Sequence, residues 1–153
     1  MPALRSRYLA MSMLAVCLLV LGTATRGMAA SDGSKPIQVV IPGEDRFTPF
    51  AVTIRVGQKV TWVNKDSETH YVVSDDAFNT AGHRGVNHAV PAGGKFTLIF
   101  NHPGVFPFYC RLHAMLDADN QPKAPGPEGG IQDKDGNFGT PMNGVVTVLG
   151  HQD

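Results

Sequence analysis

Cysteine is scarce in this sequence, and its scarcity narrows the chemistry that the chain can perform. Of 153 residues only two are cysteine; Cys17 lies in an apolar leader, which leaves Cys110 alone in the remainder of the chain. A single cysteine in an exported chain indicates a metal site, an intermolecular bridge or a reactive thiol. The plain alternative is a buried thiol that packs as a small hydrophobic side chain.

The sequence also lacks an excess of charge of either sign. Lysine plus arginine and aspartate plus glutamate number 13 each, and the basic residues are not clustered. Nucleic-acid binding requires clustered lysine and arginine, so we expect no nucleic-acid partner. Three of the basic residues lie in the first 30 positions, which leaves the rest of the chain with 10 basic and 13 acidic residues, a net charge of −3 (10 − 13).

A long apolar run is absent as well, because the leader is too short to span a bilayer. Two arginines precede an apolar run at 9–21, about 13 residues, and the small residues at 28–30 suit a cleavage site. A membrane-spanning helix needs about 20 residues. We therefore expect residues 1–30 to be a signal peptide and 31–153 to form one domain exported to the periplasm. An uncleaved N-terminal anchor is the alternative.

No segment carries a sustained helical period, and the chain after the leader is typical of an all-β domain. Short runs rich in β-branched and aromatic residues alternate with turns that contain Gly, Pro or Asn. We expect strands at 37–41, 52–56, 59–63, 70–73, 96–100, 106–110 and 145–149. This spacing predicts an antiparallel sandwich or barrel. The polar segments 74–88 and 114–141 are expected to be long loops, which in compact domains are usually functional or disordered.

The residues best suited to chemistry lie where strands end or begin. Cys110 follows an apolar strand, His113 comes three residues later, and Met142 precedes the final strand. A thiolate and an imidazole held together form half of a soft metal site. A second histidine and a methionine would complete a trigonal set with a weak axial thioether, which suits copper in electron transfer. In a thiol enzyme, by contrast, His113 would activate Cys110 as a nucleophile.

A longer pattern runs through nearly the whole chain after the leader. Its elements, in chain order, are Phe47-Thr48-Pro49, Val56-Gly57, Val60-Thr61-Trp62-Val63-Asn64, His70, Tyr109-Cys110-x-x-His113 and Met142-x-Gly144-x-Val146-x-Val148. In order and spacing this pattern resembles the blue copper proteins, or cupredoxins. The C-x-x-H spacing is that of the plastocyanin-, amicyanin- and pseudoazurin-like branch.

The resemblance implies an all-β, Greek-key β-sandwich or barrel of cupredoxin type with one type 1 copper. The copper ligands would be His70, Cys110 and His113, with Met142 as the axial ligand. The protein would be a one-electron carrier between larger redox proteins, in solution or at a membrane, with no turnover of its own, and we expect a monomer. By the same analogy, electrons would leave through His113 as the more exposed imidazole. A periplasmic copper chaperone or copper-storage protein that uses the same ligands is the alternative.

Two features depart from this branch. Tyr71 stands where members commonly have an asparagine that ties the ligand loops together, so the tie must differ here. The interval from His113 to Met142 is 29 positions (142 − 113) instead of a few, which makes 114–141 an insertion and Met115 a rival axial ligand. Met142 is favoured because it begins the final strand, and closing a longer loop costs only about 0.6 kcal/mol per doubling of its length. We expect the insertion to pack little core and to serve as a docking surface near His113.

Overall fold

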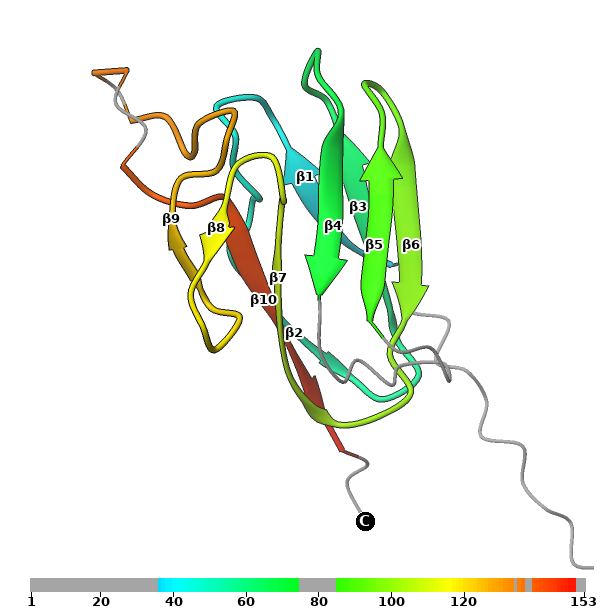
Figure 1. Ribbon diagram of the computed structural model, residues 1–153. Coiled ribbons are helices and arrows are strands. Elements are labelled where there is room, and N and C mark those ends of the chain that lie inside the picture. Colours follow the sequence, from blue (N-terminus) through cyan, green and yellow to red (C-terminus); the bar gives the residue numbers. More distant parts are fainter. Residues whose placement is uncertain (1–35, 75–84, 134, 137–138, 151–153) are drawn as a thin grey trace, which may run out of the picture.

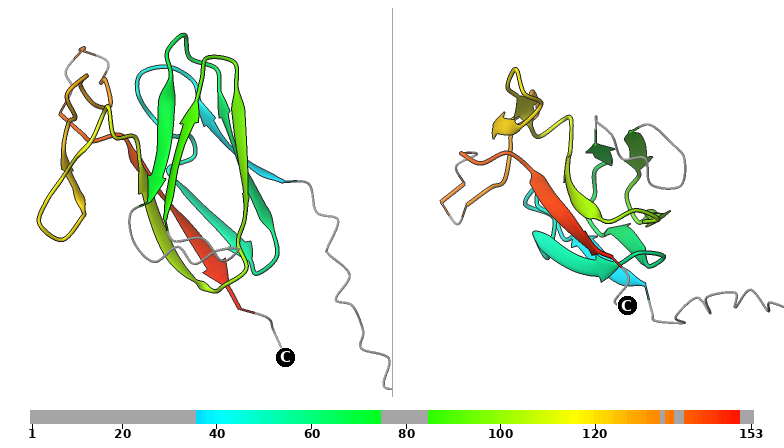
Figure 2. Two further views of the ribbon diagram at one scale, coloured as in Figure 1. Left: turned by 45° about the vertical axis from the view of Figure 1, so that its right-hand side comes forward. Right: turned by 90° about the horizontal axis from the view of Figure 1, so that it is seen from below.

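Two β-sheets packed face to face form the body of the protein (Figure 1 and Figure 2). The computed structural model describes residues 36–74, 85–133, 135–136 and 139–150. One sheet has the strand order β1-β3-β6, the second has the order β2-β10-β7-β4-β5, and β8 pairs with β9. The strands are β1 Ile37–Ile41, β2 Ala51–Arg55, β3 Lys59–Asn64, β4 His70–Ser74, β5 Val86–Val90, β6 Lys95–Ile99, β7 Gly104–Tyr109, β8 Met115–Leu116, β9 Pro122–Ala124 and β10 Asn143–Leu149. Among the described residues no helix is long and apolar enough to cross a membrane.

The two sheets are mixed, so the expected antiparallel pairing holds for most neighbouring strands but not for two pairs. β1 pairs with β3 in parallel, and so does β2 with β10, whereas the other neighbours in these sheets are antiparallel. Parallel neighbours need a crossover connection. The path from β1 to β3 provides one, because it passes through β2 in the opposite sheet. Alternation of apolar residues predicted the strands but carries no information on which distant strands meet.

Side chains that alternate along the strands fill the space between the sheets. Val52 and Ile54 of β2 are buried while their neighbours are exposed, and Val146 of β10 is fully buried. Phe108 of β7 packs edge-on against Trp62 of β3, with ring centroids 5.2 Å apart. Full burial of a large apolar side chain contributes about 1.5–3 kcal/mol. The core therefore holds the strands, and with them the strand ends, in a fixed arrangement.

Both segments that were expected to be loops contain strands. β5 lies at the edge of its sheet and pairs with β4, and three of its five residues are exposed. The polar, exposed residues of this edge strand concealed it in the sequence; the remainder of that loop, 75–84, lies outside the described residues. In the insertion, β8 and β9 form a hairpin that lies beside β7 and β10 (Figure 1).

Candidate metal centre

Four residues from three distant parts of the sequence meet at one end of the sandwich, opposite the last residues of β10 (Figure 1). His70 is the first residue of β4, Cys110 follows the last residue of β7, and Met142 precedes the first residue of β10. β7 is antiparallel to both β4 and β10. The end of β7 therefore lies beside the start of β10, where Tyr109 pairs with Asn143. Tyr109 also pairs with Val73 of β4, and the residues that follow β7 continue along β4 toward its start at His70. His113 joins them because it closes a turn on Cys110, whose carbonyl oxygen accepts from the His113 N–H at 3.0 Å.

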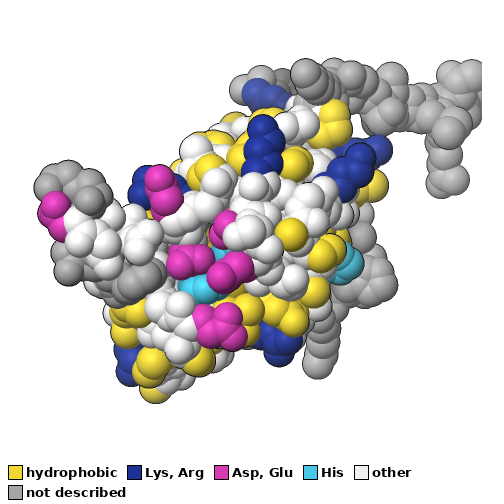
Figure 3. All heavy atoms as spheres, turned by 90° about the horizontal axis from the view of Figure 1, so that it is seen from above, with side chains coloured by type: hydrophobic (Ala, Val, Ile, Leu, Met, Phe, Trp, Pro, Cys, Tyr) yellow, Lys and Arg dark blue, Asp and Glu magenta, His cyan; other side chains and the backbone are white. Residues whose placement is uncertain are grey.

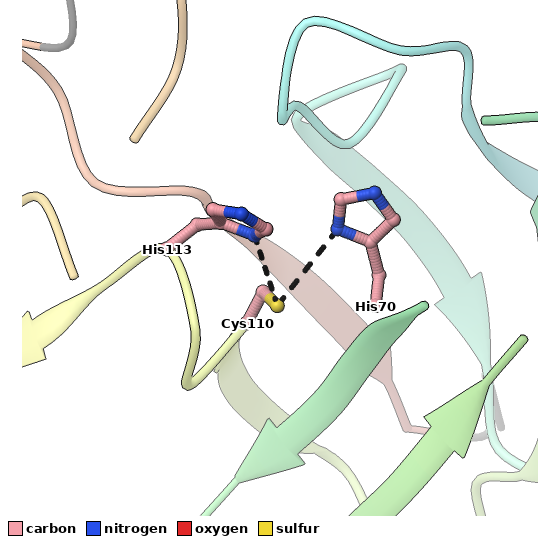
Figure 4. A group of neighbouring side chains, drawn as sticks. All are labelled: His70, Cys110 and His113. Carbon is pink, nitrogen blue, oxygen red and sulfur yellow. Dashed lines mark hydrogen bonds between the residues drawn. The ribbon is translucent and has the colours of Figure 1, made fainter. Parts of the chain in front are cut away.

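One sulfur and two ring nitrogens converge at this end (Figure 4). Cys110 Sγ lies 3.4 Å from His113 Nδ1 and 3.9 Å from His70 Nδ1. The three donor atoms lie within 4.8 Å of one another. Relative exposure is 0 % for Cys110 and His70 and 1 % for His113. A buried thiolate with two imidazoles fits copper, which accepts soft and borderline ligands in both oxidation states.

Hydrogen bonds from its surroundings favour the thiolate form of Cys110. The backbone N–H of Tyr71 donates to Cys110 Sγ at 3.3 Å. Burial raises the pKa of the Cys110 thiol, but hydrogen bonds from His113, His70 and the backbone outweigh burial and lower the pKa to about 6. For both histidines, burial is the largest influence and lowers the pKa, but the hydrogen bond with Cys110 and the negative charges of Cys110 and the nearby carboxylates together outweigh it, and the pKa is raised. The thiolate, which the surroundings favour, is the form of Cys110 that binds metal.

Met142, the predicted axial residue, is buried next to the ligand loop, whereas Met115, the alternative axial residue, is half exposed. Met142 is 0 % exposed and belongs to the same core cluster as Cys110. Its carbonyl oxygen accepts from the Cys110 N–H at 3.0 Å, and its N–H donates to the His113 carbonyl at 2.9 Å. Met115 lies on β8 and is 49 % exposed. Gly144, two residues after Met142, leaves room for the ring of Phe108, because a Cβ there would lie 2.6 Å from that ring.

Tyr71 and Arg111, which directly follow the first histidine and the cysteine, contact each other. Arg111 Cζ lies 3.9 Å from the centroid of the Tyr71 ring. β4 and β7 are paired where Val73 faces Tyr109. Beyond that pair, toward the metal centre, this cation–π contact joins the two strands, together with the hydrogen bond from Tyr71 to Cys110. The tie that was expected to differ from asparagine is thus an aromatic–guanidinium contact, worth about 0.5–1 kcal/mol at an exposed site.

Each imidazole also has a carboxylate at its second nitrogen. Asp66 Oδ2 lies 2.8 Å from His70 Nε2, and Asp45 Oδ1 lies 3.4 Å from His113 Nε2. Burial raises the pKa of the Asp45 carboxyl. Burial also acts to raise the pKa of Asp66, but hydrogen bonds from His70 and Ser67 outweigh it and the pKa is lowered. Neither carboxylate was identified from the sequence.

In the view onto this end of the molecule, acidic side chains lie around the small area where histidine atoms can be seen (Figure 3). Asp45 and Asp66 are themselves largely buried, with side-chain exposures of 16 % and 18 %. Electrons were expected to leave through His113 as the more exposed imidazole. His70 and His113 are buried almost equally, at 0 % and 1 %, so exposure does not distinguish them and the exit through His113 stays a prediction. The spacing of the ligands gave no information on what lies above them.

The insertion packs directly on the loop that carries the ligands. The Glu128 N–H donates to the Leu112 carbonyl oxygen at 2.9 Å. A Cβ on Gly126 would lie 2.3 Å from the same oxygen and 2.5 Å from the backbone nitrogen of Ala114. Ile131 is partly buried against the main core cluster. The part of the insertion at 126–131 is therefore structural. The role of the insertion as a docking surface stays a prediction.

Comparison with known proteins places these features in a family. The chain matches the family described as Cupredoxin-like domain over residues 10–119, a stretch that ends before Met142. It is 33 % identical over 72 residues to the chloroplastic plastocyanin of Physcomitrium patens, a match that covers 44 % of this chain and 43 % of that protein. The chain thus spans less than half the length of this relative.

Solved structures agree on the fold. Two amicyanin variants in the Cu(I) form are similar at a TM-score of 0.50 and 18 % identity, one over 76 % of this chain and 84 % of that chain, the second over 79 % and 90 %. The predicted cupredoxin-type β-sandwich is confirmed, and the donor set fits the predicted type 1 copper. Because the family match covers more than half of its residues, the chain belongs to the cupredoxin-like family.

Proposed function

We propose that the protein holds one type 1 copper at this centre and carries single electrons between larger redox proteins. The observation that carries the proposal is the convergence of Cys110 Sγ with the Nδ1 atoms of His70 and His113, all from residues at most 1 % exposed. When bound there, copper supplies a one-electron couple between Cu(II) and Cu(I). The chain supplies the geometry and the environment.

The first contribution of the protein is to hold the donor atoms still. His70 and Cys110 lie at the ends of two antiparallel strands of one sheet, and the turn to His113 is closed by a backbone hydrogen bond. Sites built on strands are more precise than sites on loops. A donor set that cannot rearrange suits a carrier, because little then has to move when the electron arrives or leaves.

The second contribution is the exclusion of water and of other ligands. The three donors are buried, and both histidines are covered by carboxylates. An enzyme that binds substrate at its metal needs an open coordination position. We therefore propose a carrier without turnover of its own.

We propose Met142 as the axial ligand. Its side chain is fully buried in the core cluster that includes Cys110, and its backbone is hydrogen-bonded on both sides to the ligand loop. Met115 pairs with Ala124 in the β8–β9 hairpin and is half exposed. Burial and backbone connection thus agree with the position of Met142 at the start of the last strand.

We further propose that the domain works outside the cytoplasm as a monomer, after removal of residues 1–30. The leader has the charged and apolar regions of a signal peptide. The redox partners are larger proteins in solution or at a membrane. Without the leader the chain carries a net charge of −3 (10 − 13).

Copper handling, as a chaperone or store, would use the same ligands. A protein that passes copper on must let an acceptor reach the donors. Here Cys110 is 0 % exposed and both imidazoles are covered. The arrangement favours retention of the metal over its transfer.

Cycles of oxidation and reduction test the proposal. The copper-loaded carrier will be intensely blue when oxidised, will lose the colour on reduction and will regain it on reoxidation without losing copper to a chelator. A chaperone would instead release Cu(I) to an acceptor. A thiol enzyme would be alkylated at Cys110 whether or not copper is present. Either of these two results would contradict the proposal.

A further inference from the structure

We propose that Asp66 and Asp45 are positioning residues of the metal centre, each acting through one ligand imidazole. This inference rests on the proposed function, since it concerns the same copper site. In His70 and in His113, Nδ1 faces the sulfur of Cys110 (Figure 4). The second ring nitrogen, Nε2, of each histidine faces a carboxylate. A carboxylate that accepts from the Nε2–H keeps the hydrogen on that nitrogen, and Nδ1 is left with its lone pair free for the metal.

Asp66 is itself held in place by the turn between β3 and β4. Its backbone N–H donates to Asn64 Oδ1 at 2.9 Å. The Asn64 side-chain amide in turn donates to the carbonyl oxygens of Glu68 at 2.6 Å and Val90 at 2.9 Å. Asn64 is 1 % exposed. These hydrogen bonds fix the turn that carries Asp66. The Asp66 carboxylate is therefore held in position against His70, which a residue that orients a ligand requires.

Asp45 is held in place by an unusual backbone and by the insertion. Glu44 and Asp45 have φ values of 62° and 51°, in the left-handed region that residues other than glycine seldom adopt. Such conformations persist only when the surroundings impose them, and they are frequent at functional sites. Arg46 Nη2 donates to the Gln132 carbonyl at 3.1 Å, and the Gln132 N–H donates to the Glu44 carbonyl at 3.2 Å. The insertion thus fixes the segment that places Asp45 on His113.

Two carboxylates directly behind the ligands favour the more highly charged oxidation state. Each places a negative charge next to an imidazole in a buried environment, which stabilises Cu(II) more than Cu(I). Loss of such an outer partner typically lowers metal affinity about 10–100-fold. A loss that is tenfold greater for Cu(II) than for Cu(I) raises the reduction potential by about 59 mV. Asp66, at 2.8 Å, should act more strongly than Asp45, at 3.4 Å.

Four variants separate charge from orientation. Asp66→Asn removes the charge but keeps an oxygen that can accept the hydrogen bond, and Asp66→Ala removes both. Asp45→Asn tests the second histidine. Asp119→Asn is the control, because it removes the same charge by the same isosteric change from an exposed side chain of the β8–β9 hairpin that belongs to no cluster of described residues with the ligand histidines. We expect the ratio of Cu(II) to Cu(I) affinity to fall about tenfold or more in Asp66→Asn, less in Asp45→Asn and least in Asp119→Asn.

Nitrogen-15 NMR of the metal-free protein gives a measurement independent of copper. In the wild type, His70 Nε2 should carry a hydrogen whether or not Nδ1 also donates to the Cys110 thiolate, and in Asp66→Ala a population with the hydrogen on Nδ1 alone should appear. If Asp66→Ala does not fold, the isosteric Asp66→Asn decides through the affinity ratio. The inference is overturned, with the proposed function intact, if the protein is blue but Asp66→Asn changes the ratio no more than Asp119→Asn. A wild type that binds copper without becoming blue overturns both.

Discussion

Substitution of Gly126 by alanine will distort the metal centre from outside it. A Cβ at this position would lie 2.3 Å from the Leu112 carbonyl oxygen and 2.5 Å from the Ala114 nitrogen. Ordinary contact begins at 3.4 Å, so one of the two backbone segments must move by about 1.1 Å (3.4 − 2.3). Overpacking of this kind costs about 1–3 kcal/mol. Leu112 lies between Cys110 and His113, so the displacement reaches the ligands.

Denaturant unfolding of the metal-free protein and the visible and EPR spectra of the Cu(II) form measure the two effects. Gly126→Ala should lower the free energy of unfolding by about 1–3 kcal/mol and should alter both spectra. Gly139→Ala is the matched control in the same insertion, because its Cβ would meet no atom of the described residues within 4 Å. If Gly126→Ala equals the wild type in stability and in spectra, the insertion does not press on the ligand loop and the reasoning fails.

Three further predictions concern the site itself. Met142→Leu should raise the reduction potential, on the order of 59 mV for each tenfold loss of Cu(II) affinity relative to Cu(I), while Met115→Leu should change it little; the opposite result would make Met115 axial. Tyr71→Leu should destabilise the protein by about 0.5–1 kcal/mol and broaden the EPR signal, whereas Tyr71→Phe should do neither, because it keeps the ring. Arg111→Gln should also destabilise the protein, and an Arg111→Gln variant as stable as the wild type would contradict the cation–π contact as a tie. In the metal-free protein the ultraviolet absorbance of the Cys110 thiolate should titrate near pH 6, and a midpoint near 9.0 would contradict the hydrogen bonds assigned to it. Because the folded pKa lies below the unfolded value, the thiolate's contribution to stability is complete above about pH 9.0 and is lost as the pH falls through about 6.

Most strands could be predicted because a half-buried strand leaves a period of two in its sequence. Val52 and Ile54 alternate with exposed residues, and the structure has β2 within one residue of the predicted bounds. β5 has no such period, because an edge strand with exposed side chains needs no apolar face. The parallel pairing of β1 with β3 depends on the whole topology and has no local signal.

In the metal centre too, features with a local sequence signal could be predicted, and features that depend on distant contacts could not. Cys110 and His113 are three residues apart, and that spacing sufficed to indicate a metal site. Asp66 lies four positions before His70 and could have been considered as its partner. Asp45 lies 68 positions before His113 (113 − 45) and reaches it only through a turn that the insertion holds. The burial of His113 could not be predicted either, because it depends on these distant contacts.

The visible absorption spectrum of the Cu(II)-loaded protein, recorded beside that of Cys110→Ser, tests the central claim most directly. The buried Cys110 sulfur and the two imidazoles, when they bind Cu(II), should give the wild type an intense blue band. Cys110→Ser should lose that band while its far-ultraviolet circular dichroism shows the same β-sheet content. A Cys110→Ser variant that stays blue, or a folded wild type that binds Cu(II) without colour, would contradict the assignment of a type 1 copper site.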